Sequence, residues 1–172
     1  MKIRTPGGKL LLWLISLVIL SLCGCAGMIS STNEGKGATQ LGPSIKMDKA
    51  ELGFLYLSED GSIFFCENQI IPLKENTFFG WRIHLITNKE KVTWEEVFIL
   101  PESPSVWGYT KGTEVDVQGK VATTEKTVSP QNGWIGHGWF AAPGDPPGNY
   151  KIEIYIEGVL AKIFTFEMKP LD

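Results

Sequence analysis

The chain has few of the residues that most directly indicate a chemical function. It holds two histidines and three cysteines in 172 residues. Cys66 is the only cysteine outside the apolar N-terminal stretch, so an intramolecular disulfide framework is excluded as the source of stability. His84 and His137 are 53 residues apart, and no short spacing joins them to further ligands as in a known metal motif. We therefore expect neither a metal nor another cofactor.

Positive charge is also scarce. The whole chain carries 16 basic and 19 acidic residues, for a formal net charge of −3. Three of the basic residues and none of the acidic ones lie in residues 1–24, so the remainder carries 13 basic against 19 acidic residues, a net charge of −6. A mildly acidic protein has no electrostatic footprint for nucleic acid. We expect no nucleic-acid partner.

No apolar run is long enough to span a bilayer, which takes about 20 residues. The longest run, residues 10–22, follows a positively charged start with Lys2, Arg4 and Lys9 and precedes the small Gly24. These are the three parts of a secretory signal, so we expect residues 1–24 to be removed. An uncleaved anchor is the alternative, which the shortness of the run disfavours.

The end of this run, Leu22-Cys23-Gly24-Cys25, resembles the lipobox of bacterial lipoproteins. The resemblance implies cleavage before Cys25 and acylation of its sulfur, as by palmitate. Cys23 fits less well because Leu22, which is not small, precedes it. Ala26-Gly27 lacks the Asp that retains lipoproteins in the inner membrane, so the resemblance implies the outer membrane, on its periplasmic or surface side. Two or three acyl chains anchor a protein stably.

The segment after the signal has the composition of a tether. Residues 25–48 are rich in Gly, Ser, Thr and Asn and hold few large apolar groups, which disfavours a packed core. From residue 49 the composition shifts, and we expect one folded domain over 49–172.

Short strands with period-two alternation follow one another through this domain. In residues 78–87, Phe79, Trp81, Ile83 and Leu85 share one face, opposite Arg82 and His84. In residues 92–100, Val92, Trp94, Phe98 and Leu100 are in register. Glu96 breaks this register, so we expect a bulge near Glu95-Glu96. Further candidate strands cover 50–57, 62–66, 114–117, 122–128 and 133–141.

The last two strands are the clearest. Tyr150, Ile152, Ile154 and Ile156 alternate with polar residues, and Glu157-Gly158 supplies a two-residue hairpin turn. The predicted apolar face of the return strand comprises Leu160, Phe164, Phe166 and Met168. No segment shows a sustained helical period. Many short strands separated by turns indicate an all-β sandwich or barrel.

The segment 142–168, with a Pro/Gly turn, G-N-Y, an alternating strand, an E-G turn and F-T-F-E-M, resembles the last two strands of immunoglobulin-like domains. Together with I-I-P and F-F-G-W-R-I in 70–83, it resembles a family of uncharacterised bacterial immunoglobulin-like domains of unknown function. The resemblance implies an immunoglobulin-like antiparallel β-sandwich, in which the Tyr150 hydroxyl bonds back to the preceding corner. The antibody-type cysteine pair is absent.

The candidate catalytic groups do not form a pattern. Cys66 follows Phe64-Phe65, and we expect a buried, inert thiol, with intermolecular pairing as the alternative. Neighbours on a strand point to opposite faces, so we expect Glu95-Glu96 to be solvated surface charge rather than an acid–base pair. The sequence favours a protein that is not an enzyme, although a cleft uniting His137 with a carboxylate would favour catalysis.

Aromatic residues in the less regular segments are candidates for a ligand surface, namely Trp107, Tyr109, Trp134 and Trp139; core packing is the alternative we favour. The sequence thus predicts a lipid-anchored envelope protein with a binding or scaffolding sandwich. Its partners would be the membrane and an envelope protein or glycan. The alternatives are a carbohydrate- or peptidoglycan-binding module and, third, an enzyme of unknown class.

Overall fold

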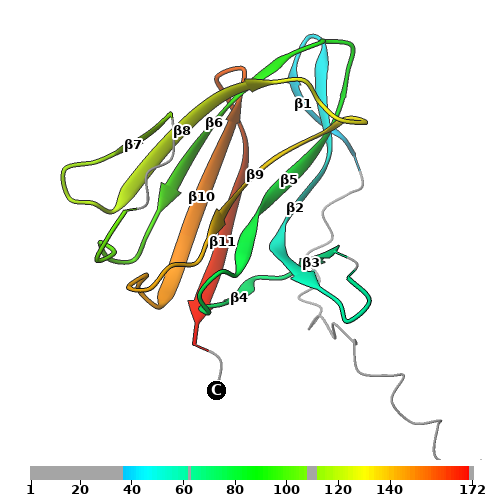
Figure 1. The fold of residues 1–172 in the computed structure, drawn as a ribbon. Helices are drawn as coiled ribbons and strands as arrows, with labels where there is room; N and C mark the ends of the chain where they lie inside the picture. The colour runs from blue at the N-terminus through cyan, green and yellow to red at the C-terminus, as the bar shows by residue number, and fades with distance from the viewer. Residues whose placement is uncertain (1–36, 62, 108–111, 171–172) are drawn as a thin grey trace, which may run out of the picture. The chain divides into compact units, whose positions relative to one another are not determined.

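The computed structural model describes residues 37–61, 63–107 and 112–170 (Figure 1). The predicted signal, the lipidation site Cys25 and Tyr109 lie outside the described residues. The described residues form eleven strands and no helix. The strands are β1 (Thr39–Gly42), β2 (Ile45–Leu57), β3 (Ile63–Glu67), β4 (Ile70–Pro72), β5 (Phe78–Thr87), β6 (Val92–Ile99), β7 (Thr113–Val115), β8 (Val121–Val128), β9 (Trp134–Phe140), β10 (Gly148–Ile156) and β11 (Val159–Lys169).

The strands pack as two sheets. The first has the order β1-β2-β5-β9, with β3 also pairing with β2, and the second has the order β4-β11-β10-β6-β8-β7 (Figure 1). Every pair is antiparallel except β4 with β11, which is parallel. The predicted all-β sandwich is confirmed. None of the residues that the structure describes belongs to a helix long and apolar enough to cross a membrane.

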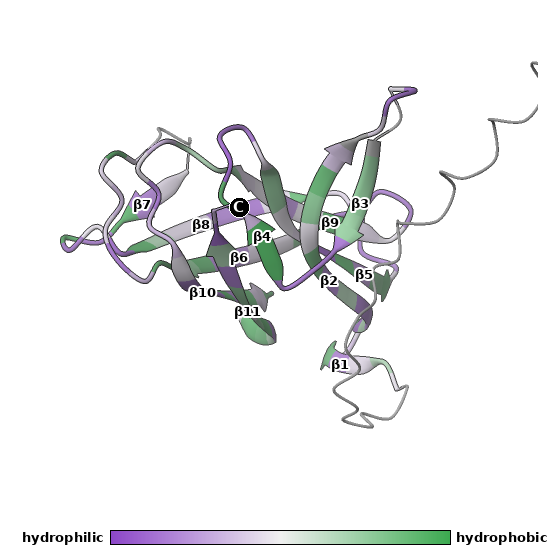
Figure 2. Cartoon of the chain, turned by 90° about the horizontal axis from the view of Figure 1, so that it is seen from below, coloured by the Kyte–Doolittle hydropathy of each residue, from purple (hydrophilic) through white to green (hydrophobic). Residues whose placement is uncertain are grey.

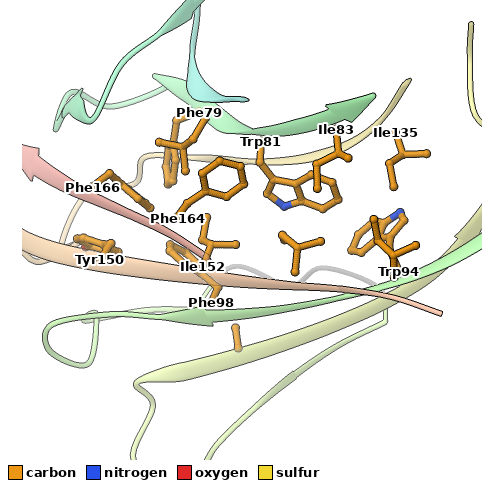
Figure 3. Packing of buried hydrophobic residues seen from close by; sticks show 14 of the residues in the cluster. Phe79, Trp81, Ile83, Trp94, Phe98, Ile135, Tyr150, Ile152, Phe164 and Phe166 are labelled. Atoms are coloured by element: carbon orange, nitrogen blue, oxygen red, sulfur yellow. The ribbon is translucent and has the colours of Figure 1, made fainter. Parts of the chain in front are cut away.

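The core lies between the two sheets and follows the predicted alternation. The inward residues of β5, Phe79, Trp81, Ile83 and Leu85, are each at most 2% exposed. They point toward the second sheet, as Figure 3 shows for Trp81 and Phe79 against Phe98 and Ile152. Each large apolar side chain buried in this way stabilises the fold by about 1.5–3 kcal/mol.

A tyrosine fixes the corner before β10, as predicted. The buried Tyr150 hydroxyl donates to the carbonyl oxygen of Pro146 at 2.6 Å. Burial, and then the nearby Asp145 carboxylate, raise the pKa of Tyr150 above its usual value. The following hairpin turn is also confirmed, since Glu157 and Gly158 both have positive φ, 51° and 76°.

Two predicted registers are wrong. The bulge expected near Glu95-Glu96 is absent from β6, because Glu96 pairs in unbroken register with Ile154 on one side and with Thr124 on the other, and its side chain faces the core. The bulge lies instead in the last hairpin, where Ile154 pairs with Lys162 but Tyr155 pairs with Leu160. This extra residue turns Leu160 outward, so that it is 46% exposed rather than part of the return face.

The sheets also begin earlier than the sequence indicated. β1 and the first part of β2 cover residues 39–42 and 45–48, within the expected tether. Leu41 and Ile45 are buried there in the core, which the surrounding polar composition concealed. The three-residue β4 was not expected as a strand, and its Ile71 is fully buried near the lower end of the sandwich, which Figure 2 shows from below.

Candidate binding site

A fully buried carboxylate lies at the centre of the sandwich. Glu96 is 0% exposed, and its two oxygens face three nitrogens from the opposite sheet. Trp81 Nε1 donates to Oε2, Trp139 Nε1 donates to Oε1 at 2.7 Å, and His137 Nδ1 lies 3.2 Å from Oε1. We call these four residues the Glu96 cluster.

Strand alternation brings the cluster together. Glu96 occupies the inward phase of β6 between Trp94 and Phe98. Trp81 of β5 and His137 of β9 are directly paired across the first sheet, and Trp139 is the next inward residue of β9. Three aromatic side chains with ring N–H groups therefore converge on the one acidic residue that faces them.

The cluster is arranged to satisfy a charge that burial would otherwise make costly. A buried carboxylate is tolerated only where donors replace its lost hydration. The indole nitrogens can only donate. With Nδ1–H of His137 also donating to Glu96, the imidazole Nε2 is left as the nitrogen with a free lone pair. Trp94 Nε1 is the one buried side-chain nitrogen or oxygen for which the described residues provide no partner.

His137 also lines a pocket of about 560 Å³ on the first sheet. Glycines from three adjacent strands contribute to its lining, and apolar side chains from β2, β3 and β5 contribute further. The lining residues are Gly53, Leu55, Phe65, Phe78, Gly80, Trp81, Arg82, Lys126, Gly136, His137 and Gly138. Cavities of roughly 300–1,000 Å³ with this mixture are typical of ligand sites.

The glycines of the pocket are required by the sheet itself. A Cβ on Gly80 would lie 2.2 Å from the His137 carbonyl oxygen, and one on Gly53 would lie 2.0 Å from the Cys66 carbonyl oxygen. The neighbouring backbones approach too closely for any side chain there. At these glycines the three strands carry no side chain, so their backbone forms the floor of the pocket.

Arg82 projects from β5 beside this bare strip. Its guanidinium carbon lies 4.3 Å from the Phe65 ring centroid and 4.8 Å from that of Trp134, both favourable cation–π distances. Its Nε donates to Glu51 on β2. Burial raises the pKa of Glu51, but hydrogen bonds from Lys49 and Arg82 outweigh it, and the pKa is lowered from its usual value.

All the ionisable side chains that line the pocket are basic or imidazole groups. Arg82 is bonded to Glu51 and His137 to Glu96. Lys126 forms no ion pair with any described residue; its Nζ lies 5.8 Å from the Trp94 ring centroid. The pocket thus offers an ammonium group without a carboxylate partner.

The predicted ligand aromatics do not share one surface. Trp139 faces inward to Glu96, while Trp134 lies on the outer face, 5.1 Å from the His84 ring. Trp107 donates to the Gly119 carbonyl oxygen and packs edge-on against Trp139 at 6.3 Å. Both Trp139 and Trp107 are therefore partly buried residues that pack against the core.

The other candidates have mixed outcomes. Glu96 is buried, so the prediction of solvated charge is wrong for it. His84 lies on the second face, as expected, with Nδ1 3.1 Å from Asp48. Cys66 is half-buried rather than fully buried. Within the described ranges, no three His, Cys, Asp or Glu residues are close enough to hold a metal ion.

The sequence pattern did not predict the pocket residues Phe65, Phe78, Arg82 and Lys126. One signal was available, since Gly136 and Gly138 alternate with His137 and Trp139 and mark a strand with one bare face. The pairing of this strand with β5, which completes the pocket, could not be read from the sequence.

The pairing of His137 with Glu96 is the contact that we named as favouring catalysis. A carboxylate that orients an imidazole is a common arrangement for a general base. The described residues that line the pocket include no serine, threonine or cysteine.

Residues 50–169 match the family described as the PM0630 beta sandwich domain. The chain belongs to this family. The match covers the second half of β2 and every strand from β3 to β11 of this chain. Among curated proteins, no match is found.

Solved structures provide distant similarities. An immunoglobulin-like protein from Pseudomonas aeruginosa is 17% identical, with a TM-score of 0.49 over 73% of this chain and 96% of that one. An alkylpurine DNA glycosylase from Pseudomonas fluorescens, bound to DNA with an abasic site analogue, is 12% identical, with a TM-score of 0.33 over 70% of this chain and 30% of that one. Neither likeness bears on activity.

Proposed function

We propose that this member of the PM0630 beta sandwich domain family is a lipid-anchored envelope protein whose sandwich is a non-catalytic binding domain. The pocket over Gly53, Gly80 and Gly138 is the observation that carries the proposal. It combines bare backbone, aromatic walls and a basic side chain without an ion-pair partner, and such concave, mostly apolar sites with few polar groups are typical of ligand binding. The anchor rests on the N-terminal pattern ending at Cys25.

Site-specific photo-crosslinking in cells tests the binding role. A photoreactive phenylalanine analogue at Phe78, in the pocket wall, is expected to give a discrete adduct with an envelope component. The same analogue at Val117, which is fully exposed on the loop after β7, is the matched control. Equal labelling at both positions, or none at Phe78, would contradict the proposal.

The anchor has a separate test. Cys25→Ser is expected to leave an uncleaved precursor that takes up no labelled palmitate, while Cys23→Ser is processed normally. Normal labelling of the Cys25 variant would end the lipoprotein hypothesis without bearing on the pocket.

A carbohydrate- or peptidoglycan-binding module is the second candidate. It is favoured by the aromatic rings on the outer face, where Phe140 is 65% exposed and its ring lies 4.9 Å from that of Phe78. Such rings can pack on the apolar faces of sugars. Co-sedimentation with insoluble peptidoglycan that is lost in Phe140→Ala would support it.

Catalysis is the third candidate, and one substitution separates it from binding. His137→Asn places an amide N–H near the position of Nδ1, so it retains a donor to Glu96, but it has no basic nitrogen. A folded His137→Asn protein that still gives the Phe78 crosslink but has lost its function in cells would favour an enzyme. Loss of the crosslink together with function would favour binding, because His137 also lines the pocket.

A further inference from the structure

The free edge of β9 has unpaired backbone groups. In an antiparallel pair, alternate residues direct both N–H and C=O toward the neighbour. Ala141 N donates to Thr77 O, and Gly133 O accepts from Leu85 N, so the odd-numbered residues of β9 face β5. The even-numbered ones, Gly136, Gly138 and Phe140, face the opposite way, where no described residue pairs with their backbones. Only Trp134 is paired on that side, with Gln131.

β9 is also the longest edge strand among those described. It has seven residues, whereas β1, β3, β4 and β7 have four, five, three and three. Natural proteins block exposed edges with lysine, proline, a bulge or a very short strand. The sequence of β9, W-I-G-H-G-W-F, contains no lysine or proline, and its pairing with β5 is unbroken.

The second sheet continues past this edge. β9 lies over β6, with the His137 ring 5.2 Å from that of Trp94 and the Trp139 ring 5.2 Å from that of Phe98. β8 and β7 follow β6 in the second sheet, whereas no described strand follows β9 in the first (Figure 1). A strand added beside β9 would therefore extend the first sheet over β8, where Lys126 lines the pocket.

Charge specifies what such a strand carries. Lys126 forms no ion pair with a described residue, whereas Arg82 and His137 already face Glu51 and Glu96. None of the described residues that line the pocket is acidic. An Asp or Glu in the added strand would complement Lys126.

We propose that β9 accepts an extended segment of a partner polypeptide as an added strand, with an acidic side chain of that segment paired to Lys126. Main-chain hydrogen bonds from Gly136, Gly138 and Phe140 supply the affinity, and the Lys126 contact supplies the selectivity, as is general for strand addition. This proposal rests on the binding function above and specifies its partner as an acidic extended polypeptide.

The test uses the full chain, isotope-labelled in detergent micelles, and a pool of eight-residue N-acetyl peptides with Thr, Val or Ser at every position except a central Glu. We expect amide shifts to be largest at Gly136, Gly138 and Phe140. Replacing the central Glu by Lys is expected to weaken binding at least tenfold, and Lys126→Gln is expected to remove most of that difference. Absence of shifts on β9 at millimolar peptide, or an equal response to both pools, overturns the proposal.

A matched pair of variants tests the backbone contact. Phe140→Pro removes an edge-facing N–H that β5 does not use, and Phe140→Ala removes the same side chain but keeps the N–H. Binding is expected to fall at least tenfold in the proline variant relative to the alanine variant, while both unfold at similar denaturant concentrations. Should the proline variant be unfolded, alternate N-methylation of the peptide tests the same bonds, and undiminished binding then overturns the proposal.

Two further outcomes distinguish this proposal from the broader one. If Phe140→Pro leaves the Phe78 crosslink in cells unchanged, the pocket has a ligand that does not use the edge, and only the strand-addition proposal fails. If crosslinking at Phe78 is absent from the wild type, the binding function fails as well. A dimer by sedimentation that Phe140→Pro dissociates would identify a second copy of this chain as the occupant and overturn the acidic partner.

Discussion

Replacing Glu96 by Gln tests whether the buried carboxylate is held by its donors. A glutamine amide keeps only one acceptor oxygen. If that oxygen takes the Oε1 position, the Trp81 N–H faces an NH₂ group; if it takes the Oε2 position, the Trp139 N–H does. In either orientation one indole N–H loses its acceptor inside the core.

The size of the effect follows from these contacts. One buried donor without a partner costs about 1–3 kcal/mol, and the remaining hydrogen bonds lose their charge assistance. A neutral amide is less costly to bury, which offsets part of this loss. We expect Glu96→Gln to lower the free energy of unfolding by about 2–3 kcal/mol. Glu96→Leu leaves both indole groups without an acceptor and is expected to cost about 3–5 kcal/mol.

The assay is urea unfolding followed by tryptophan fluorescence, with Glu95→Gln as the matched control. Glu95 is the preceding residue of β6, and its side chain points to the opposite face, where a polar substitution changes stability by less than about 0.5 kcal/mol. If Glu96→Gln is no more destabilising than Glu95→Gln, the donors do not stabilise the carboxylate and the description of the cluster is refuted.

Three further predictions concern other buried side chains. Tyr150→Phe removes the corner hydrogen bond and is expected to lower the free energy of unfolding by about 1–2 kcal/mol. Burial raises the pKa of Tyr150, so its contribution to wild-type stability should be complete below about pH 10 and decrease above it. The Tyr150→Phe variant should lose less stability over the same alkaline range. Glu51 has a lowered pKa, so it contributes stability above about pH 4.3 that is lost as the pH falls through its folded value. The gap between wild type and Glu51→Gln in urea midpoint should therefore narrow at acid pH, and a constant gap would contradict the ion-pair assignment. Ile154→Asp is expected to unfold the sandwich, whereas Val117→Asp, the same change at a fully exposed site, should leave the circular-dichroism melting curve almost unchanged.

Alternation in the sequence was sufficient for the central strands. The inward residues of β5, β6 and β10 were predicted correctly, apart from Glu96. The extra residues of the irregular pairs lie in β2 and β11, so period two survives along β5, β6 and β10 themselves. The same rule failed at Leu160, since a bulge changes the phase and leaves no mark in the hydrophobic pattern. It also failed at Glu96, where a charged residue in an apolar series was interpreted as a break in register.

The Glu96 cluster could not be predicted because its partners come from other strands. Trp81 was assigned to the core, and Trp139 was a candidate for a ligand surface with core packing as the favoured alternative. The indole N–H groups that stabilise the carboxylate become apparent only when the two sheets face each other. The pocket depends likewise on the lateral order of β2, β5 and β9. Sequence spacing contains no information on that order. β9 pairs with β5 although some 50 residues separate them, and the strands between them in the sequence, β6 to β8, belong to the second sheet.

The parallel pairing of β4 with β11 has a consequence for the order of folding. Ile70 pairs with Glu167, roughly 100 residues further along the chain, and contacts of such long range form slowly. β4 therefore has no strand to pair with until β11 has been made. The β10–β11 hairpin joins strands that are adjacent in the sequence, whereas β4 waits for β11, so a nascent chain cannot complete the sandwich before β11 has been synthesised.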